Sequence, residues 1–215
     1  PNIDQLAAEG VRYEFAYSNA PVCAVARSTL ITGRYACSIG TQNMRSRYPI
    51  PSDIQPFVSY LRESGYYCVN RSKTDYNFKV DMKQAWDMSS RKATWRNRPD
   101  KSMPFFHMQS FADSHESSLH FPIKQLEKPT TTLPTEVDLP PYFPDTPIMR
   151  YTMARYYDRM RIIDGHVGRI INQLREDGLL ENTFVFYFGD HGGVLPRSKG
   201  YAYESGLHVP FVVRI

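Results

Sequence analysis

A cysteine and an arginine stand four residues apart near the start of the chain, in the segment Cys23-Ala24-Val25-Ala26-Arg27. Residues four apart in a helix lie on the same face. If a helix begins at Cys23, the thiol and the guanidinium lie beside free backbone N–H groups, which suits an anion held next to a nucleophile. The alternative is a buried thiol followed by a surface arginine. A cysteine phosphatase is excluded, because its phosphate loop needs a longer spacing between the two residues.

Three further polar segments each follow a predicted strand. They are residues 70–75 after the strand at 66–69, residues 113–116 after the apolar run at 105–111, and residues 189–193 after the strand at 183–188. In parallel α/β sheets, ligands bind at the carboxyl ends of the strands. These segments therefore fall where an active site would be assembled.

The elements that must position these segments alternate between helix and strand. The predicted helices are residues 3–9 with Gly10 as the C-terminal cap, 26–31, 56–64 and 148–174; the predicted strands are residues 11–17, 66–69, 105–111, 183–188 and 210–215. The continuous apolar run at 183–188 is typical of a strand buried on both faces. Helices alternating with buried strands predict an α/β layer fold with a parallel sheet. Residues 124–146 are rich in proline and predict a long loop.

Composition narrows the class of protein. The 215 residues are 41% hydrophobic and 22% charged, which argues against wholesale disorder. No run approaches the roughly 20 apolar residues that a membrane helix needs. Three cysteines are too few for a disulfide scaffold. The basic segment 91–101 lacks a nucleic-acid fold motif beside it and is interpreted as a solvated loop.

Both ends of the chain indicate a piece of a longer protein. The sequence starts with Pro1, shows no signal-like segment, and stops within the predicted strand at 210–215. We therefore expect residues 1–215 to be one incomplete domain that contains the loop at 124–146.

The chain resembles the formylglycine-dependent sulfatases of the alkaline-phosphatase-like superfamily, in particular bacterial polysaccharide-type members. The segment from Cys23 to Arg34 resembles their signature, Cys-x-Pro/Ala-x-Arg followed by Thr-Gly-Arg. The other similar segments are residues 1–11, which lead into the signature; 72–75, at the family's lysine element; 114–117, at its substrate-side histidine; 188–199, its closing metal-and-lysine motif; and 203–211, the strand after it. The resemblance implies a three-layer α/β/α sandwich with a mostly parallel sheet, here truncated at both ends.

The resemblance also implies a covalent route to sulfate ester hydrolysis. A formylglycine-generating enzyme would oxidise Cys23 to an aldehyde, whose hydrate attacks the ester sulfur, expels the alcohol and then eliminates sulfate. Arg27 would hold the diol, while Lys73 and Lys199 would clamp the sulfate oxygens. His115 would hydrogen-bond the bridging oxygen and protonate the leaving alcohol.

A Ca²⁺ site is implied in the same way. Asp190 and His191 would be metal ligands, and two more carboxylates would come from a strand that precedes this chain. Lys73, Asp75, His115, Lys199 and His208 would contact the substrate, a sulfated small molecule or polysaccharide. Such relatives are periplasmic or secreted, and we expect neither a nucleic-acid partner nor a membrane span.

Two positions depart from the family pattern. Val25 occupies the third signature position, where the maturation enzyme expects Pro or Ala, and Asp75 stands where many members have His. Two alternatives therefore stay open. One is a phosphoester or phosphonate hydrolase of the same superfamily with the same nucleophile. The other is a catalytically silent binding protein for sulfated glycans, which Val25 favours.

A few other polar residues predict structural roles. Asp164 lies within the long predicted helix and is expected to make a structural hydrogen bond. Cys37 and Cys68 are expected to be free, buried thiols.

Replacing Val25 with Pro should raise the aldehyde fraction at Cys23 and arylsulfatase-type turnover together when the chain is co-expressed with a maturation enzyme. Proline fixes φ in the short extended segment that is recognised, whereas valine permits extension but offers different contacts. Peptide mass spectrometry over Cys23 should show low but measurable conversion with Val25 in place. Full conversion of the unchanged sequence would contradict this prediction, and no turnover despite full conversion would favour the silent binder.

Overall fold

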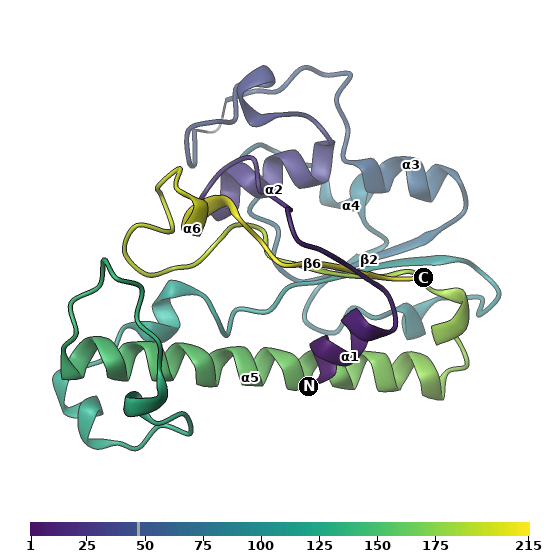
Figure 1. Cartoon of the computed structure of the whole chain (residues 1–215). Helices are drawn as coiled ribbons and strands as arrows, with labels where there is room; N and C mark the ends of the chain where they lie inside the picture. The colour runs from purple at the N-terminus through teal and green to yellow at the C-terminus, as the bar shows by residue number, and fades with distance from the viewer. Residues whose placement is uncertain (47) are drawn as a thin grey trace. The chain divides into compact units, whose positions relative to one another are not determined.

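A computed structural model describes residues 1–46 and 48–215 (Figure 1). Backbone contacts divide the chain into two compact units. The first unit comprises residues 1–14, 111–188 and 210–215, and the second comprises residues 15–110 and 189–209. No helix in the described part of the chain combines the length and the apolar character needed to cross a membrane.

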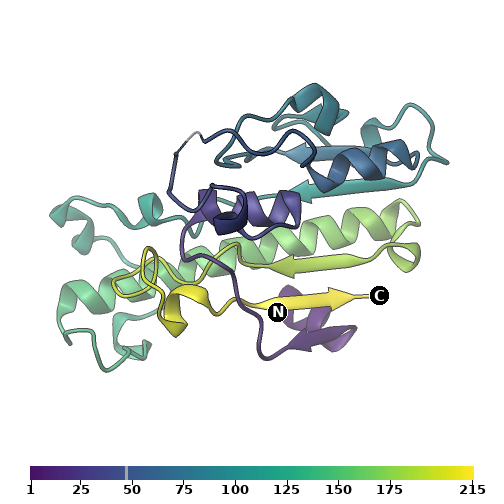
Figure 2. The ribbon, with the colours of Figure 1, turned by 90° about the horizontal axis from the view of Figure 1, so that it is seen from above.

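The second unit contains a parallel sheet of three strands. Its middle strand β2 (Tyr67–Arg71) pairs in parallel with β3 (Met88–Ser89) on one edge and with β4 (Phe105–Gln109) on the other (Figure 2). Cys68, Val69 and Asn70 are fully buried in β2. The predicted buried strand and the parallel pairing are therefore confirmed for this part of the chain.

Four α-helices belong to the second unit: α2 (Cys23–Thr32), α3 (Phe57–Glu63), α4 (Met82–Ala85) and α6 (Glu204–Leu207). Helix α2 follows an extended Val22 and ends at Gly33, whose φ of 65° is a left-handed cap. It begins at Cys23, so the thiol and Arg27 do share one helix, as the spacing predicts. The short α4 and β3 lack a sequence pattern long enough to predict them.

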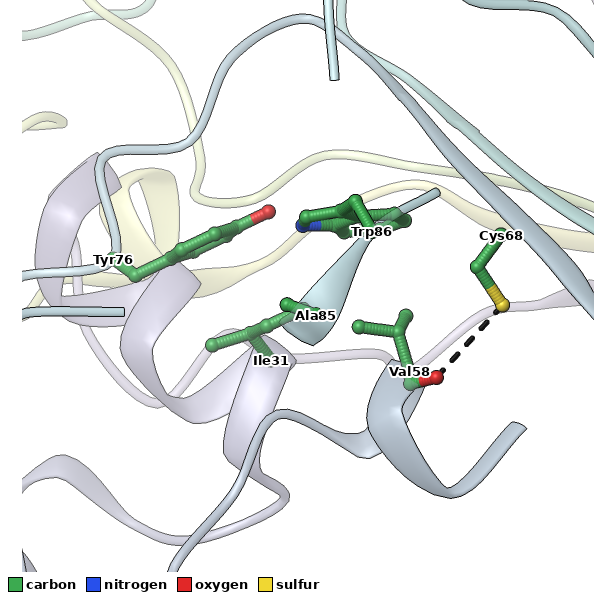
Figure 3. Close-up of a cluster of buried hydrophobic side chains, with 6 residues drawn as sticks. All are labelled: Ile31, Val58, Cys68, Tyr76, Ala85 and Trp86. Carbon is green, nitrogen blue, oxygen red and sulfur yellow. Dashed lines mark hydrogen bonds between the residues drawn. The ribbon is translucent and has the colours of Figure 1, made fainter. Parts of the chain in front are cut away.

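A hydrophobic cluster joins α2, α3 and α4 to strand β2. It consists of Ile31, Val58, Cys68, Tyr76, Ala85 and Trp86, all nearly or fully buried. Figure 3 shows the Tyr76 and Trp86 rings beside the aliphatic side chains of α2 and α3, with the Cys68 thiol donating to the Val58 carbonyl at 3.8 Å. The cluster fixes α2 against β2, and hence fixes the two segments that carry Cys23 and residues 72–75.

The free cysteines divide differently from the prediction. Cys68 is buried as expected, and burial raises the pKa of its thiol to about 12. Cys37 is exposed, so the expectation that it is buried is wrong. It lies in a short 3-10 helix, Ala36–Ser38, in which Ala36 is the residue that enters the core.

The first unit has a sheet of three antiparallel strands. Strand β6 (Phe211–Arg214) lies between β1 (Val11–Tyr13) and β5 (Val185–Phe188), as Figure 2 shows. The long helix α5 (Pro147–Glu176) begins at the capping hydroxyl of Thr146, and α1 (Asn2–Ala8) packs against both α5 and β6 (Figure 1). The helix predicted at 148–174 is confirmed. The sequence predicts it well because its apolar face is long and regular.

Short 3-10 helices supply most of the remaining regular structure. Besides Ala36–Ser38 they are Trp95–Asn97, Glu116–Leu119, Ile123–Glu127, Pro134–Glu136 and Leu180–Asn182. Residues 124–146 contain no strand and no α-helix in the described structure.

Strand β5 is not buried on both faces, so that expectation is wrong. Burial raises the pKa of Tyr187, which lies near Tyr156 and Asp164 of α5. On the opposite face the rings of Phe186 and Phe188 remain substantially exposed beside Phe211. The residues alternate because α5 covers one face only, and an aromatic run hides this alternation in the sequence.

Gly10 serves close packing and is not a left-handed cap, contrary to the expectation. Its φ is not positive, but a Cβ atom at this position would lie 2.2 Å from the carbonyl oxygen of Val213. Only glycine lets the chain leaving α1 run this close to β6.

Asp164 fastens α1 to the long helix. Its carboxylate accepts hydrogen bonds from the backbone N–H of Asn2 at 3.1 Å and of Ile3 at 2.8 Å, and from the Asn2 side-chain amide at 2.6 Å. Burial alone would raise the pKa of Asp164, but these donors together lower it to about 2. The structural role predicted for Asp164 is confirmed.

Replacing Asp164 with Asn should lower the free energy of unfolding at pH 7 by about 2 kcal/mol, because a neutral amide accepts these hydrogen bonds less strongly. The folded pKa lies below the ordinary value, so the carboxylate stabilises the chain at neutral pH. That stabilisation is lost as the pH falls from about 4 toward 2. Urea unfolding should therefore show a gap between wild type and variant that narrows below pH 4. A gap that stays constant with pH would contradict the prediction, and replacement of the exposed Asp138 with Asn is the control.

Candidate active site

The first residue of α2 places its thiol against an acidic side chain. Cys23 is 3% exposed, and its Sγ donates to Oδ2 of Asp75 at 3.4 Å. Val25 is also buried, where it packs with Ala20, Val22 and Ala36. The signature helix is therefore held from both sides.

Arg27 fixes the segment that carries Lys73 and Asp75. The guanidinium is 4% exposed, and it donates to the carbonyl of Thr74 at 2.8 Å and to that of Lys73 at 2.7 Å. It also lies 5.6 Å from the centre of the Tyr76 ring. A buried guanidinium needs this number of partners, because desolvation of an unpaired charge is costly. The planar fork suits two consecutive carbonyls.

Asp75 adopts a backbone conformation that is uncommon for residues other than glycine. Its φ is 49°, in the left-handed region that Asp tolerates better than most residues. The turn directs its carboxylate to Cys23 while Arg27 holds the two preceding carbonyls. The thiol of Cys23 and the loop that carries Lys73 and Asp75 are thus held on the same face of α2.

The loop after β5 places the carboxylate of Asp190 beside Lys73. Oδ2 of Asp190 lies 3.7 Å from the Lys73 ammonium, and Oγ of Ser18 lies 2.7 Å from the Asp190 carbonyl oxygen. The N–H of Gly192 donates to the carbonyl of Gly206 at 2.8 Å, and the N–H of Gly193 donates to the carbonyl of Ser205 at 2.9 Å. Hydrogen bonds therefore hold this loop along the segment that leads to α6.

The pKa of His191 is influenced by the charged side chains around it. Its side chain is 7% exposed, and its Nδ1 lies 2.9 Å from the carbonyl oxygen of Gly192. The pKa of His191 is lowered chiefly by burial; Asp190 opposes the shift, while Lys199 and Lys73 add to it. The two lysines and Asp190 are therefore near enough to one imidazole to influence its protonation.

The second unit thus gathers most of the predicted site residues. They are Cys23, Arg27, Lys73, Asp75, Asp190, His191 and Lys199. His208 lies in the same unit, where its ring stacks on Tyr17 at 5.1 Å and faces Glu204. His115 belongs to the first unit, where its Nδ1 lies 2.9 Å from the Ser117 hydroxyl. Its approach to the other residues stays a prediction.

Three supporting residues were missed by the sequence analysis. Ser18 contacts the backbone of Asp190, Tyr76 lies under the Arg27 guanidinium, and Ser110 Oγ lies 3.5 Å from an Arg27 nitrogen. None of them has a spacing that links it to Cys23. Ser110 directly follows the observed strand β4, but the predicted strand at 105–111 included it and so hid this position.

The predicted metal ligands are Asp190 and His191. Among residues 1–46 and 48–215, no group of three or more His, Cys, Asp and Glu side chains is arranged to hold a metal ion. Asp190 offers partly exposed carboxylate oxygens, the donor type that Ca²⁺ prefers. The donor set therefore fits Ca²⁺ in kind, and needs further oxygen ligands to complete it.

Comparison with known proteins shows which family the sequence resembles. A family model described as Sulfatase matches residues 1–215. An ulvan-active sulfatase of Formosa agariphila is 37% identical over 258 aligned residues, which cover 100% of this chain and 43% of that protein. The chain thus spans less than half the length of this relative.

Solved structures share the fold. A phosphonate monoester hydrolase from Silicibacter pomeroyi superposes with a TM-score of 0.74 at 16% identity, covering 100% of this chain and 62% of the other. A protein solved in complex with its substrate D-glucosamine-2-N,6-O-disulfate gives 0.68 at 16% identity, with 100% and 65% covered. The chain therefore has the α/β fold of the alkaline-phosphatase-like enzymes.

Replacing Arg27 with Lys should lower the free energy of unfolding by about 2 kcal/mol, because one ammonium cannot serve two carbonyls in the planar geometry. Cys23 should then react faster with a thiol reagent, since residues 73–75 are no longer held. Urea unfolding and timed labelling measure the two effects. Arg34→Lys, at an exposed position beyond the same helix, is the control and should change stability by less than about 0.5 kcal/mol. Equal behaviour of the two variants would contradict the assignment.

Proposed function

Because the chain belongs to the sulfatase family, we propose that it forms part of a sulfuric ester hydrolase that removes sulfate from a sulfated glycan. One observation carries the proposal. The loop that contacts Cys23 through Asp75 also carries Lys73, which lies 3.7 Å from Asp190, and Lys73 and Lys199 both lower the pKa of the adjacent His191. Residues 1–215 would be an incomplete catalytic domain.

Lys73 and Lys199 would bind the sulfate oxygens. A lysine ammonium acts as a point charge that suits an oxyanion without fixing its orientation. As the ester bond to sulfur breaks, negative charge grows on the leaving oxygen and on the sulfuryl group, and cations already in place stabilise it. The pairing of Lys73 with Asp190 supports this role, because it holds the ammonium in position before substrate arrives.

Cys23 would supply the nucleophile after conversion to formylglycine, whose hydrate offers one hydroxyl for attack on sulfur and another for release of sulfate. Asp75 is placed to accept a proton or a hydrogen bond from that position. Arg27 would act mainly by positioning, since two of its nitrogens hold backbone carbonyls. His208 would contact the substrate, and His115 would protonate the leaving alcohol.

Asp190 and His191 would hold a Ca²⁺ ion together with carboxylates outside the described residues. Such an ion, when bound, supplies positive charge next to the sulfuryl oxygens. Burial keeps His191 neutral near pH 7, which leaves its Nε2 able to donate a lone pair. The positive charge of the site would then come from lysines and metal alone.

A sulfated polysaccharide is the substrate class that the relatives support. One relative is an ulvan-active sulfatase, and one protein of the same fold was solved with D-glucosamine-2-N,6-O-disulfate as its substrate. Enzymes acting on external polysaccharides work outside the cytoplasm, so we propose a periplasmic or secreted location. A formylglycine-generating enzyme would be the maturation partner.

A phosphonate or phosphoester hydrolase is the second candidate. The structural likeness to a phosphonate monoester hydrolase favours it, since sulfate and phosphonate groups are both tetrahedral. The two differ in charge, and the sequence relative is a sulfatase. A silent sulfated-glycan binder remains the outcome if Cys23 is not converted.

The full-length protein, matured by co-expression, should hydrolyse an aryl sulfate faster than an aryl phosphonate monoester. Asp190→Ala should lower aryl sulfate turnover by a factor of about 100 or more, because the site loses a metal ligand and the partner of Lys73. Chelator treatment of wild type should reduce turnover similarly, with recovery on addition of Ca²⁺ to wild type only.

The exposed Asp53→Ala is the matched control and should keep full turnover. Undiminished turnover after chelation would remove the metal role. A reversed substrate preference would favour the phosphonate hydrolase, and substrate binding without turnover in fully converted protein would favour the silent binder.

A further inference from the structure

A cavity of about 420 Å³ lies in the first unit, between the loop at 129–131 and the N-terminal half of α5. Figure 1 shows the segment before α5 folded back along that half of the helix. None of the residues that line the cavity belongs to the candidate active site. Its size suits a single sugar unit or a similar small group.

Three arginines line this cavity. Arg155, Arg159 and Arg161 all come from α5. Arg155 is oriented, because its Nε donates to the carbonyl of Ser118 at 3.2 Å and its guanidinium lies 5.7 Å from the centre of the Phe121 ring. Arg159 makes no hydrogen bond or ion pair within residues 1–46 and 48–215. Its guanidinium is therefore available to a ligand.

Asp158 is the one carboxylate among the residues that line the cavity, and its oxygens accept hydrogen bonds from the loop. It accepts hydrogen bonds from the N–H of Thr131 and of Thr132, both at 2.8 Å, and from the Thr132 hydroxyl at 2.9 Å. These donors hold the pKa of Asp158 below its usual value, although burial acts in the opposite direction. The loop is thereby fastened to α5, and the lining keeps an excess of positive charge.

We propose that this cavity binds an anionic group of a glycan chain, a sulfate half-ester or a carboxylate, at a sugar other than the one whose sulfate is removed. The inference rests on the proposed function for the glycan. Guanidinium groups match both anions by paired N–H donors, and a rigid wall reduces the entropy lost on binding. The hydroxyl-bearing loop of Thr130 and Thr131 faces the arginines and suits the hydroxyl groups of a sugar ring.

Binding of a sulfated oligosaccharide to full-length protein tests the proposal, with Cys23→Ala in every sample to prevent turnover. Arg159→Gln should weaken binding about tenfold, the expected loss of a charge-assisted hydrogen bond, and the loss should shrink at high salt. Arg159→Lys should restore part of the affinity, since it keeps charge but not the paired donors. Calorimetry measures the affinities, and thermal unfolding checks that the variants fold.

Arg169→Gln, farther along α5 and outside the cavity, is the control and should bind as the parent does. A desulfated oligosaccharide that keeps its carboxylates separates the two anions: equal sensitivity to Arg159→Gln assigns the carboxylate, and loss of that sensitivity assigns the sulfate. Unchanged affinity of Arg159→Gln for both oligosaccharides would overturn the proposal. Aryl sulfate turnover of matured protein with Cys23 intact, measured in parallel, reports separately on the proposed function.

Discussion

The placement of the candidate site depends on one buried charge. Arg27 is enclosed by protein on all sides, and its removal from water would be unfavourable without the carbonyls of Lys73 and Thr74 as partners. Those carbonyls lie in a loop that also needs donors, because no strand or helix serves them there. Each therefore satisfies the other, and the nucleophile helix and the lysine loop become one rigid assembly. The contact between Cys23 and Asp75 is a consequence of this arrangement.

Around this assembly the charges are balanced by pairs rather than left to repel. Lys73 faces Asp190, and burial keeps His191 neutral instead of adding another cation. The charge of Lys73 is thus partly compensated by Asp190 before any anion arrives. An arriving tetrahedral anion would meet positive charge already fixed in position, which is the condition for effective stabilisation of a charged transition state.

Sequence patterns predicted the elements that carry long periodic signals, and local packing decided the rest. Helix α5 and strand β2 followed from apolar spacing, and the helix that begins at Cys23 was predicted over residues 26–31. The alternating exposure of β5 did not, because an aromatic run looks the same whether one face or two are covered. The candidate site residues were predicted from the order of their motifs along the chain. The partners of Arg27 could not be found in this way, since backbone carbonyls have no sequence identity.

Burial of Cys23 also fixes an order of events. An enzyme that oxidises a side chain must enclose it within its own catalytic centre, and a thiol that is 3% exposed and contacts Asp75 is not accessible in the folded chain. If Cys23 is converted to formylglycine, conversion would therefore precede folding and would compete with collapse of the core around α2. The yield of aldehyde would then depend on the rate of conversion relative to the rate of folding. A sequence that folds quickly would give less aldehyde even when its signature is well recognised.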